Sequence, residues 1–341
     1  MARVLTLPVV LLALLPAPAV ADIIYVHPGG AGDYTTIPEG VANATMDDTV
    51  LVAAGTYSVS YPGWPVVLHS ASPTIVSEDG AEATVIRYGT PFQTLSGDHD
   101  CRVRIIGFTI RETAQPVCRS GDDGAWFLFT DNIIVDNYQG LDASQGTGLI
   151  ARNLICNNGE RGIYTFHYWG IIEDNEICGH DRGIIGACCE NPTVRRNHIH
   201  HNAVTGSAPG IDARQSENLV EHNGTGLFVG FGGEAQNNIV RYNEIGVRFN
   251  GSGAIPFHGN DLYENTLYNL KIEDCWSGPL DATMNWWGTT DPDEIAASIW
   301  DAEDDPGVGC YVVFDPWCTL PGCNVTAVDC ASWGTIKAMF R

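Results

Sequence analysis

Three histidines stand within four positions of the segment RRNHIHHN, residues 195–202. His198, His200 and His201 carry imidazole rings, whose nitrogens are common ligands of zinc and copper ions. Their spacing raises the hypothesis of a metal site. Whether the three rings meet depends on the backbone that carries them.

The histidine segment is one copy of an internal repeat. Each copy begins with asparagine, has an aliphatic residue two places later and usually a second asparagine five places later. A glycine with an aliphatic residue then usually opens another strand, so each copy predicts about three short strands separated by tight turns. The copies recur every 20–22 residues and begin at Asn132, Asn153, Asn175, Asn197, Asn218, Asn238 and Asn260.

A unit of this kind cannot bury its apolar side alone, whereas stacked copies enclose a continuous core. We therefore predict an all-β solenoid, a parallel β-helix with about 21–22 residues per coil. Equivalent asparagines of successive coils then lie roughly 4.8 Å apart and form hydrogen-bonded ladders at the turns. Thr36 and Glu39 have the spacing of a helix capping box, and a second short helix is expected from Asp291 to near Trp300. These helices would cover the two open ends of the solenoid.

The repeat also places the histidines. Ile199 occupies the inward aliphatic position, so His198 and His200 point outward from one strand. The next coil adds an outward carboxylate beside His200 and another imidazole at the turn. The candidate metal ligands are therefore His198, His200, His201, Glu221 and His222. The alternative is an ordinary solvated surface that holds no ion.

The chain has eleven cysteines, and its residues 1–21 have the features of a secretory signal peptide, so disulfides are expected. The odd number leaves at least one cysteine outside an internal pair. Cys156 and Cys178 occupy the same place in consecutive coils, so their Cα atoms should lie about 5 Å apart. We predict a disulfide between them rather than a metal site. Cys188 and Cys189 are too close together in the sequence to be assigned partners.

Three features of the chain have counterparts in a known group of proteins: GDYTTIPEGVANATMDDTVLVAAGTY near the start, the asparagine repeats, and NWWGTTDPDEIAASIWD near the end. Through these features the chain resembles the secreted right-handed β-helix proteins of the pectin-lyase-like superfamily, including the NosD-like repeat proteins. This likeness implies a right-handed solenoid domain with both caps over residues 22–317. The resemblance does not single out one function, because this superfamily contains lyases, hydrolases, esterases, epimerases and non-catalytic binders. NosD-like relatives are associated with copper-site maturation, so the resemblance also favours the hypothesis of a metal site at the histidine patch.

The sequence assigns no catalytic residue. A glycoside hydrolase needs two carboxylates that face each other across the substrate. Asp122 and Asp123 are adjacent, whereas Asp142 and Asp212 lie three coils apart. A pectate lyase needs a basic residue and a calcium-binding carboxylate cluster, and no such cluster is evident. If the protein is an enzyme, we expect a polysaccharide lyase or a glycoside hydrolase.

Aromatic side chains on a solenoid can stack on the apolar faces of sugar rings. The densest aromatic cluster is YTFHYWG, residues 164–170, which has arginines on neighbouring turns. The alternative is that about half of these rings point inward as core. The carbohydrate-binding candidates are Arg161, Tyr164, His167, Tyr168, Trp169 and Arg182. Long excursions occur only at residues 60–73 and 112–127, so a cleft is expected in the early coils.

The chain has 17 Lys and Arg against 41 Asp and Glu, a net charge of -24. This field repels nucleic acid, anionic membranes and polyuronates unless a cation bridges them. Residues 1–21 have the features of a secretory signal peptide, and no later apolar segment is long enough to span a membrane. Residues 318–341 form a cysteine-containing tail outside the repeat. We expect a secreted, periplasmic or cell-surface protein.

The leading functional hypothesis is binding or processing of an extracellular polysaccharide or cell-surface glycan. One alternative is a non-catalytic surface or matrix scaffold for protein contacts. The other is a periplasmic protein that handles copper or zinc. Calcium, zinc and copper ions are the candidate cofactors, although the sequence demands none of them, and it leaves the oligomeric state open.

Overall fold

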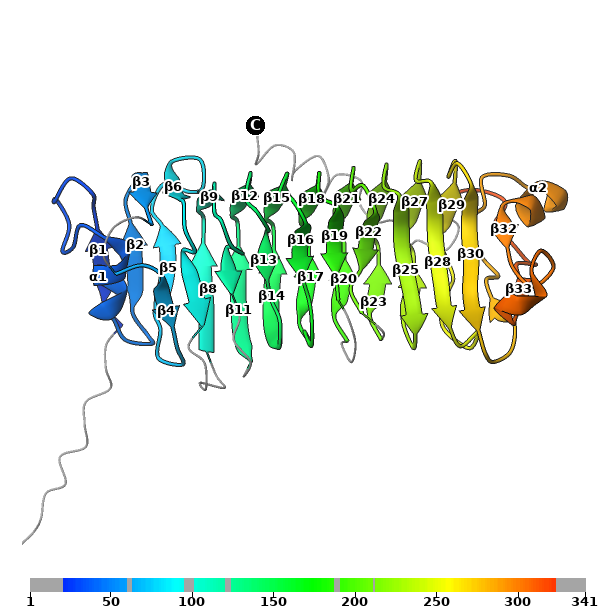
Figure 1. Cartoon of the computed structure of the whole chain (residues 1–341), viewed down its shortest axis with the longest axis horizontal. Helices are drawn as coiled ribbons and strands as arrows, with labels where there is room; N and C mark the ends of the chain where they lie inside the picture. The colour runs from blue at the N-terminus through cyan, green and yellow to red at the C-terminus, as the bar shows by residue number, and fades with distance from the viewer. Residues whose placement is uncertain are drawn as a thin grey trace, which may run out of the picture.

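The computed structural model describes residues 21–59, 63–94, 101–119, 124–186, 191–210 and 212–322. The predicted signal peptide therefore lies outside the described residues, except for Ala21, as do Cys188, Cys189 and the tail beyond Gly322. The described strands wind into a right-handed parallel β-solenoid, as predicted. Successive coils stack along one long axis, from β1 at one end to α2 at the other (Figure 1).

Each regular coil contributes one strand to each of three long parallel sheets, here called A, B and C. Sheet A contains β1 (Ile23–Val26), β2 (Thr49–Val52), β5 (Thr74–Ser77), β8 (Cys101–Ile106), β11 (Ala125–Thr130), β14 (Gly146–Ala151), β17 (Ile171–Glu173), β20 (Thr193–Arg195), β23 (Arg214–Ser216) and β26 (Glu234–Gln236). Sheet B contains β3 (Gly55–Ser58), β6 (Thr84–Arg87), β9 (Thr109–Arg111), β12 (Ile133–Val135), β15 (Leu154–Cys156), β18 (Glu176–Cys178), β21 (His198–His200), β24 (Leu219–Glu221), β27 (Ile239–Arg241) and β29 (Asp261–Tyr263). Sheet C contains β4 (Val66–Leu68), β7 (Phe92–Thr94), β10 (Cys118–Arg119), β13 (Leu141–Asp142), β16 (Arg161–Tyr164), β19 (Arg182–Ile185), β22 (Thr205–Ala208), β25 (Thr225–Phe231), β28 (Ile245–Gly251), β30 (Tyr268–Cys275) and β32 (Ile299–Trp300).

The core consists of the inward columns that the repeat predicts. The residue two places after the first asparagine is fully buried in every regular coil, as Ile155, Ile177 and Ile199 illustrate. These three residues are directly paired between β15, β18 and β21. Because the strands are in register, equivalent side chains of successive coils stack on each other and exclude water along the whole axis.

Both predicted asparagine ladders are present and buried. In the first, the Asn153 side-chain amide donates to Asn175 Oδ1 at 2.9 Å and to the Phe129 carbonyl at 3.0 Å. In the second, Asn202 donates to Asn223 Oδ1 at 2.9 Å. His180 takes the place of asparagine in this second ladder, as its sequence position implies. The ladders satisfy polar backbone groups at turns that the solenoid buries.

Helix α1 (Ile37–Ala42) covers the N-terminal end as predicted. The Glu39 backbone N–H donates to Thr36 Oγ1 at 3.3 Å, and the Thr36 hydroxyl donates to the Glu39 carboxylate at 2.9 Å. Ile37 and Val41 turn their side chains into the core. The helix therefore shields the first coil from other strands.

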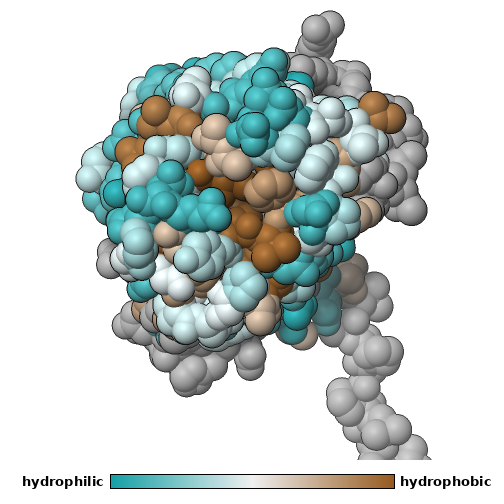
Figure 2. Space-filling model, turned by 90° about the vertical axis from the view of Figure 1, so that its right-hand side faces the viewer, coloured by the Kyte–Doolittle hydropathy of each residue, from teal (hydrophilic) through white to brown (hydrophobic). Residues whose placement is uncertain are grey.

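The C-terminal cap contains helix α2 (Pro292–Ala297), the short sheet of β31 (Leu280–Asp281) and β33 (Val312–Val313), and the 3₁₀ turn η1 (Pro306–Val308). The prediction that the helix runs to near Trp300 was wrong, because Ile299 and Trp300 pair with β30 as a strand. Pairing with the solenoid edge outweighs continuation of the helix. Figure 2 views this end and shows apolar surface left between hydrophilic residues.

The predicted disulfide between Cys156 and Cys178 is present, with a Cα separation of 4.5 Å. A second disulfide, between Cys275 and Cys310, ties β30 to the C-terminal cap and was not predicted. The first bridge joins equivalent positions of consecutive coils, and the second joins the solenoid to its cap. Among the described helices, none has the length and apolarity that crossing a membrane requires.

Candidate functional site

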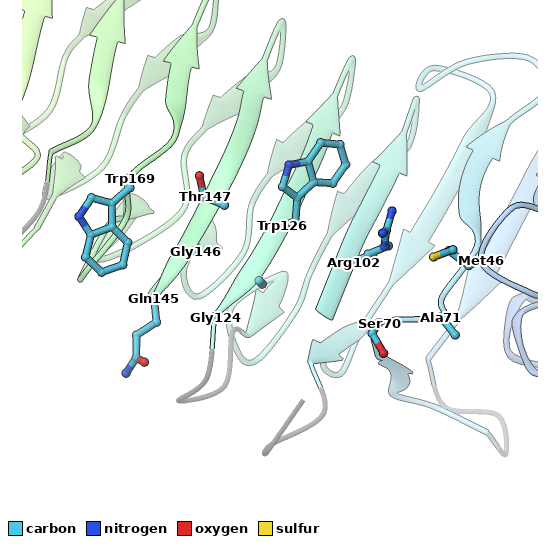
Figure 3. Close-up of a pocket in the computed structure, with 11 residues that line it drawn as sticks. Met46, Ser70, Ala71, Arg102, Gly124, Trp126, Gln145, Gly146, Thr147 and Trp169 are labelled. Carbon is cyan, nitrogen blue, oxygen red and sulfur yellow. The ribbon is translucent and has the colours of Figure 1, made fainter. Parts of the chain in front are cut away.

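An open groove of about 650 Å³ lies on the outer face of sheet A in the early coils, where the sequence predicts a cleft. Its outward column consists of Arg102 on β8, Trp126 on β11, Thr147 on β14 and Trp169 just before β17 (Figure 3). We call it the tryptophan groove. Met46 and the segment at Ser70 and Ala71 border the end of the groove nearest α1.

The register of sheet A places this column. Trp126 is paired with Arg102 on one side and with Thr147 on the other. The Trp169 backbone N–H donates to the Gly146 carbonyl at 2.9 Å, which continues the same ladder. Trp126 and Trp169 are thus two coils apart, roughly 10 Å at the usual inter-strand spacing. Trp126 is 41% exposed and Trp169 54% exposed, so both side chains are accessible from solvent.

Tyr168 does not belong to this surface, which corrects its prediction as a carbohydrate contact. It is fully buried, and its ring packs edge-on against Phe127 at a centroid distance of 6.1 Å. Its hydroxyl donates to the Gly148 carbonyl at 3.1 Å. A Cβ atom on Gly170 would lie 2.3 Å from the Tyr168 hydroxyl, so glycine is needed where the chain closes over this ring.

The other aromatic candidates form a chain of ring contacts around the turn that links β16 to β17. Tyr164 stacks on Phe166, His167 contacts Phe166 at 4.3 Å, and the His167 ring meets Trp169 edge-on at 5.8 Å. The Arg161 guanidinium lies 4.5 Å from the Tyr164 ring centre and pairs with Glu160 at 2.7 Å. Arg182 is the in-register neighbour of Arg161 in sheet C. Tyr164 and His167 therefore lie where the chain passes from sheet C to sheet A, whereas Arg161 and Arg182 stand at the first positions of β16 and β19. Among the described carbohydrate-binding candidates, Trp169 alone lines the groove.

The histidine patch lies on a different sheet. His198 and His200 point outward from β21 in sheet B, Glu176 precedes His198 in register, and Glu221 follows His200. His198 is only 12% exposed and His200 only 15%, whereas His201 and His222 are exposed, so the patch is open to solvent only in part. Burial, followed by the neighbouring His200, lowers the pKa of His198 to about 4.

The supporting contacts of the patch are specific. His198 Nε2 lies 3.0 Å from Glu221 Oε1, and Arg241 Nε donates to Glu221 Oε2 at 2.8 Å. Burial raises the pKa of Glu221, but the bonds from Arg241 and His198 outweigh it and leave the pKa below its usual value. His200 Nδ1 lies 2.8 Å from His201 Nδ1. His222 stacks on His201 at 4.9 Å.

Sequence reasoning missed Arg102, Trp126 and Thr147 in the groove and Glu176 in the patch. The repeat contains the signal for all four. Arg102, Trp126, Thr147 and Trp169 each stand six places before the first ladder position of their coils, and Glu176 and His198 each stand one place after it. Reading one outward column through successive coils would have brought these residues together.

The solved structures that are similar to this chain include two A-modules of mannuronan C-5 epimerases from Azotobacter vinelandii. The AlgE6 module is 15% identical, covers 71% of this chain and 78% of its own, and has a TM-score of 0.52. The AlgE4 module is 12% identical, covers 80% and 91%, and also has a TM-score of 0.52. At these identities the likeness shows the fold alone.

No curated protein sequence matches the chain significantly. The family described as "Right handed beta helix region" matches residues 94–267, which is about half of the chain and spans β7 to the turn before β30. The chain therefore belongs to the right-handed β-helix family.

Proposed function

We propose that the protein binds an extended polysaccharide in the tryptophan groove. The observation that carries this proposal is the pair of exposed indoles, Trp126 and Trp169, in one outward column with Thr147 between them. Indole faces stack on the apolar C–H faces of sugar rings. Their separation of roughly 10 Å is close to the length of two pyranose rings in an extended chain.

The polar residues of the groove suit hydroxyl groups. Arg102, Gln145 and Thr147 offer hydrogen-bond donors beside the indoles, and the groove is open along the solenoid axis. A long polymer can therefore lie across several coils without an end entering a pocket. The net charge of -24 disfavours polyuronates, so a neutral polysaccharide is the preferred ligand class.

Binding is favoured over cleavage at this groove. Among the described residues that line it there is no carboxylate or histidine, so this part of the groove provides no general acid and base pair. Asp122 and Asp123, which precede Gly124 at the groove, lie outside the described residues.

The test measures binding of soluble neutral glucans, mannans and xylans, with alginate and polygalacturonate as acidic comparisons, by calorimetry and affinity electrophoresis. Trp126→Ala and Trp169→Ala should each weaken binding by about 2- to 12-fold, because an aromatic contact contributes about 0.5–1.5 kcal/mol. Trp276→Ala is the matched control, since Trp276 is comparably exposed but contacts the Phe231 ring, at a centroid distance of 4.7 Å, far from the groove.

Failure of the wild type to bind any of these polymers would refute the proposal and favour a scaffold for protein contacts. Equal weakening by Trp276→Ala would also refute it, because the groove would then have no special role. Release of oligosaccharides from a bound polymer, measured as new reducing ends or unsaturated products, would replace binding with a catalytic function.

A further inference from the structure

Sheet B carries a compact group of nitrogen and oxygen donors that the groove does not use. Glu176, His198 and His200 each offer one donor atom, and the three atoms lie within 4.8 Å of one another. His200 Nε2 and Glu176 Oε1 are already 3.3 Å apart. The two imidazole rings lie side by side at a centroid distance of 4.1 Å.

We propose that Glu176, His198 and His200 form a binding site for a divalent transition-metal ion of the zinc class. A tetrahedral zinc ion with bonds of about 2.0–2.2 Å holds its ligand atoms about 3.4 Å apart, so small side-chain rotations complete the coordination. Two imidazoles and one carboxylate are donors that this class of ion prefers, and they leave one position for water. The strongly negative protein also attracts cations.

The backbone fixes this group in place. Glu176 and His198 are direct neighbours on β18 and β21, and His198 and His200 lie two residues apart on the same face of β21. Ile177 and Ile199, between the outward residues, are fully buried in the core. The strands therefore hold all three ligands on one rigid surface, as a preformed metal site requires.

Each imidazole also has a partner that fixes its orientation. His200 Nδ1 is held by His201 at 2.8 Å, and His198 Nε2 is held by Glu221 at 3.0 Å. A ring has two nitrogens, so one can bind the partner while the other binds the ion, which is the usual arrangement around metal-binding histidines. The Arg241 guanidinium already balances Glu221, which makes Glu221 a supporting residue rather than a ligand.

The assignment changes the predicted ligand set. Glu176 replaces Glu221 as the carboxylate ligand, and His201 orients His200 instead of binding the ion. His222 stacks on His201 and contacts none of the three ligands in the described interactions. Glu176, His198 and His200 are thus the proposed ligands, and His201 and Glu221 support them. His222 has no proposed role.

The experiment titrates Zn²⁺ into purified full-length protein that carries no histidine tag and has been stripped with a chelator. Calorimetry and elemental analysis should find one tightly bound equivalent. Glu176→Gln, His198→Ala and His200→Ala should each lower the affinity by more than about 100-fold, whereas His201→Ala should lower it by about 10- to 100-fold as a supporting residue. No reductant is added, so that the Cys156–Cys178 disulfide beside the site supplies no thiolate.

His222→Ala is the matched control and should retain the wild-type affinity. The proposal is overturned if the wild type binds no Zn²⁺, or if His222→Ala weakens binding as much as His200→Ala. Displacement of Zn²⁺ by a modest excess of Ca²⁺ would also overturn it, because it would indicate an oxygen-ligand site. Unfolding curves of every variant separate loss of the site from loss of the fold, and Glu176→Gln preserves side-chain volume. The visible spectrum of the Co²⁺ form should report nitrogen and oxygen coordination that His200→Ala abolishes.

Discussion

His180 gives the solenoid a specific sensitivity to acid. It occupies a buried position of the second ladder, where six other coils carry asparagine. His180 Nδ1 lies 2.9 Å from Asn202 Oδ1, and His180 Nε2 lies 3.2 Å from the side-chain nitrogen of Asn158. The first contact requires N–H on Nδ1, and the second requires a lone pair on Nε2. The ladder therefore accepts only the neutral ring.

Burial lowers the pKa of His180 to about 4; the hydrogen bond to Asn202 and the charge of Asp181 act in the opposite direction, and His200 adds to the lowering. An unfolded histidine has a pKa of about 6.5, so the unfolded chain takes up the proton first as the pH falls. The folded state consequently loses stability from about pH 6.5 down to pH 4. Linkage gives a loss of about 3 kcal/mol from this residue between pH 7 and pH 4.

His180→Asn tests this reasoning, because asparagine restores the ladder of the other coils and removes the titrating group. Denaturant unfolding followed by circular dichroism at pH 7 and pH 4 gives the change in the free energy of unfolding. The wild type should lose about 3 kcal/mol more than the variant on acidification. His27→Asn, near the N-terminus and outside the ladders, controls for removal of a histidine. Equal acid losses in the wild type and His180→Asn would refute the account.

Two further predictions concern the stability of the coils. Replacing Cys156 and Cys178 with serine should lower the free energy of unfolding by about 3 kcal/mol, since the bridge closes a loop of 22 residues. Wild type treated with reductant should lose more than the variant does, because the reductant also breaks the Cys275–Cys310 bridge. Asn197→Ala should cost about 2–4 kcal/mol in thermal unfolding, because it leaves several buried partners unsatisfied, among them the Asn175 backbone N–H and the Ile172 carbonyl. The exposed Asn191→Ala should cost less than about 0.5 kcal/mol, and similar costs for the two asparagine variants would contradict the ladder's structural role.

The fold could be predicted because each coil repeats the same physical requirements. Inward aliphatic residues and ladder asparagines recur at fixed places, so the alignment of coils gives the strand register directly. Inward alternation even accounts for Tyr168: the equivalent places in the two preceding coils hold Ala125 and Gly146, which leave room for its ring. The sequence cluster of aromatics alone did not separate Tyr168 from Trp169, but their alternation along the strand does.

Features outside the repeat could not be derived in this way. Helix α2 ends at Ala297 because the edge of sheet C offers pairing to Ile299 and Trp300, and such a tertiary contact leaves no periodic signal. The disulfide between Cys275 and Cys310 leaves no periodic signal either, because Cys275 lies on β30 and Cys310 lies in the C-terminal cap. The limited exposure of His198 and His200 could not be derived either, because a column position gives the direction of a side chain and not the extent of its burial.

The two proposed sites follow from one property of the solenoid. Burial restricts which residues can occupy ladder and core positions, whereas outward positions can change without loss of the fold. Residues that bind ligands are therefore expected in the outward columns. Parallel stacking then brings residues about 20–22 positions apart in the sequence to within one inter-strand spacing. The indoles use an outward column of sheet A, and the metal ligands use columns of sheet B. Because no residue is shared between them, a variant that removes one site leaves the chemistry of the other in place, and each proposal can fail without the other.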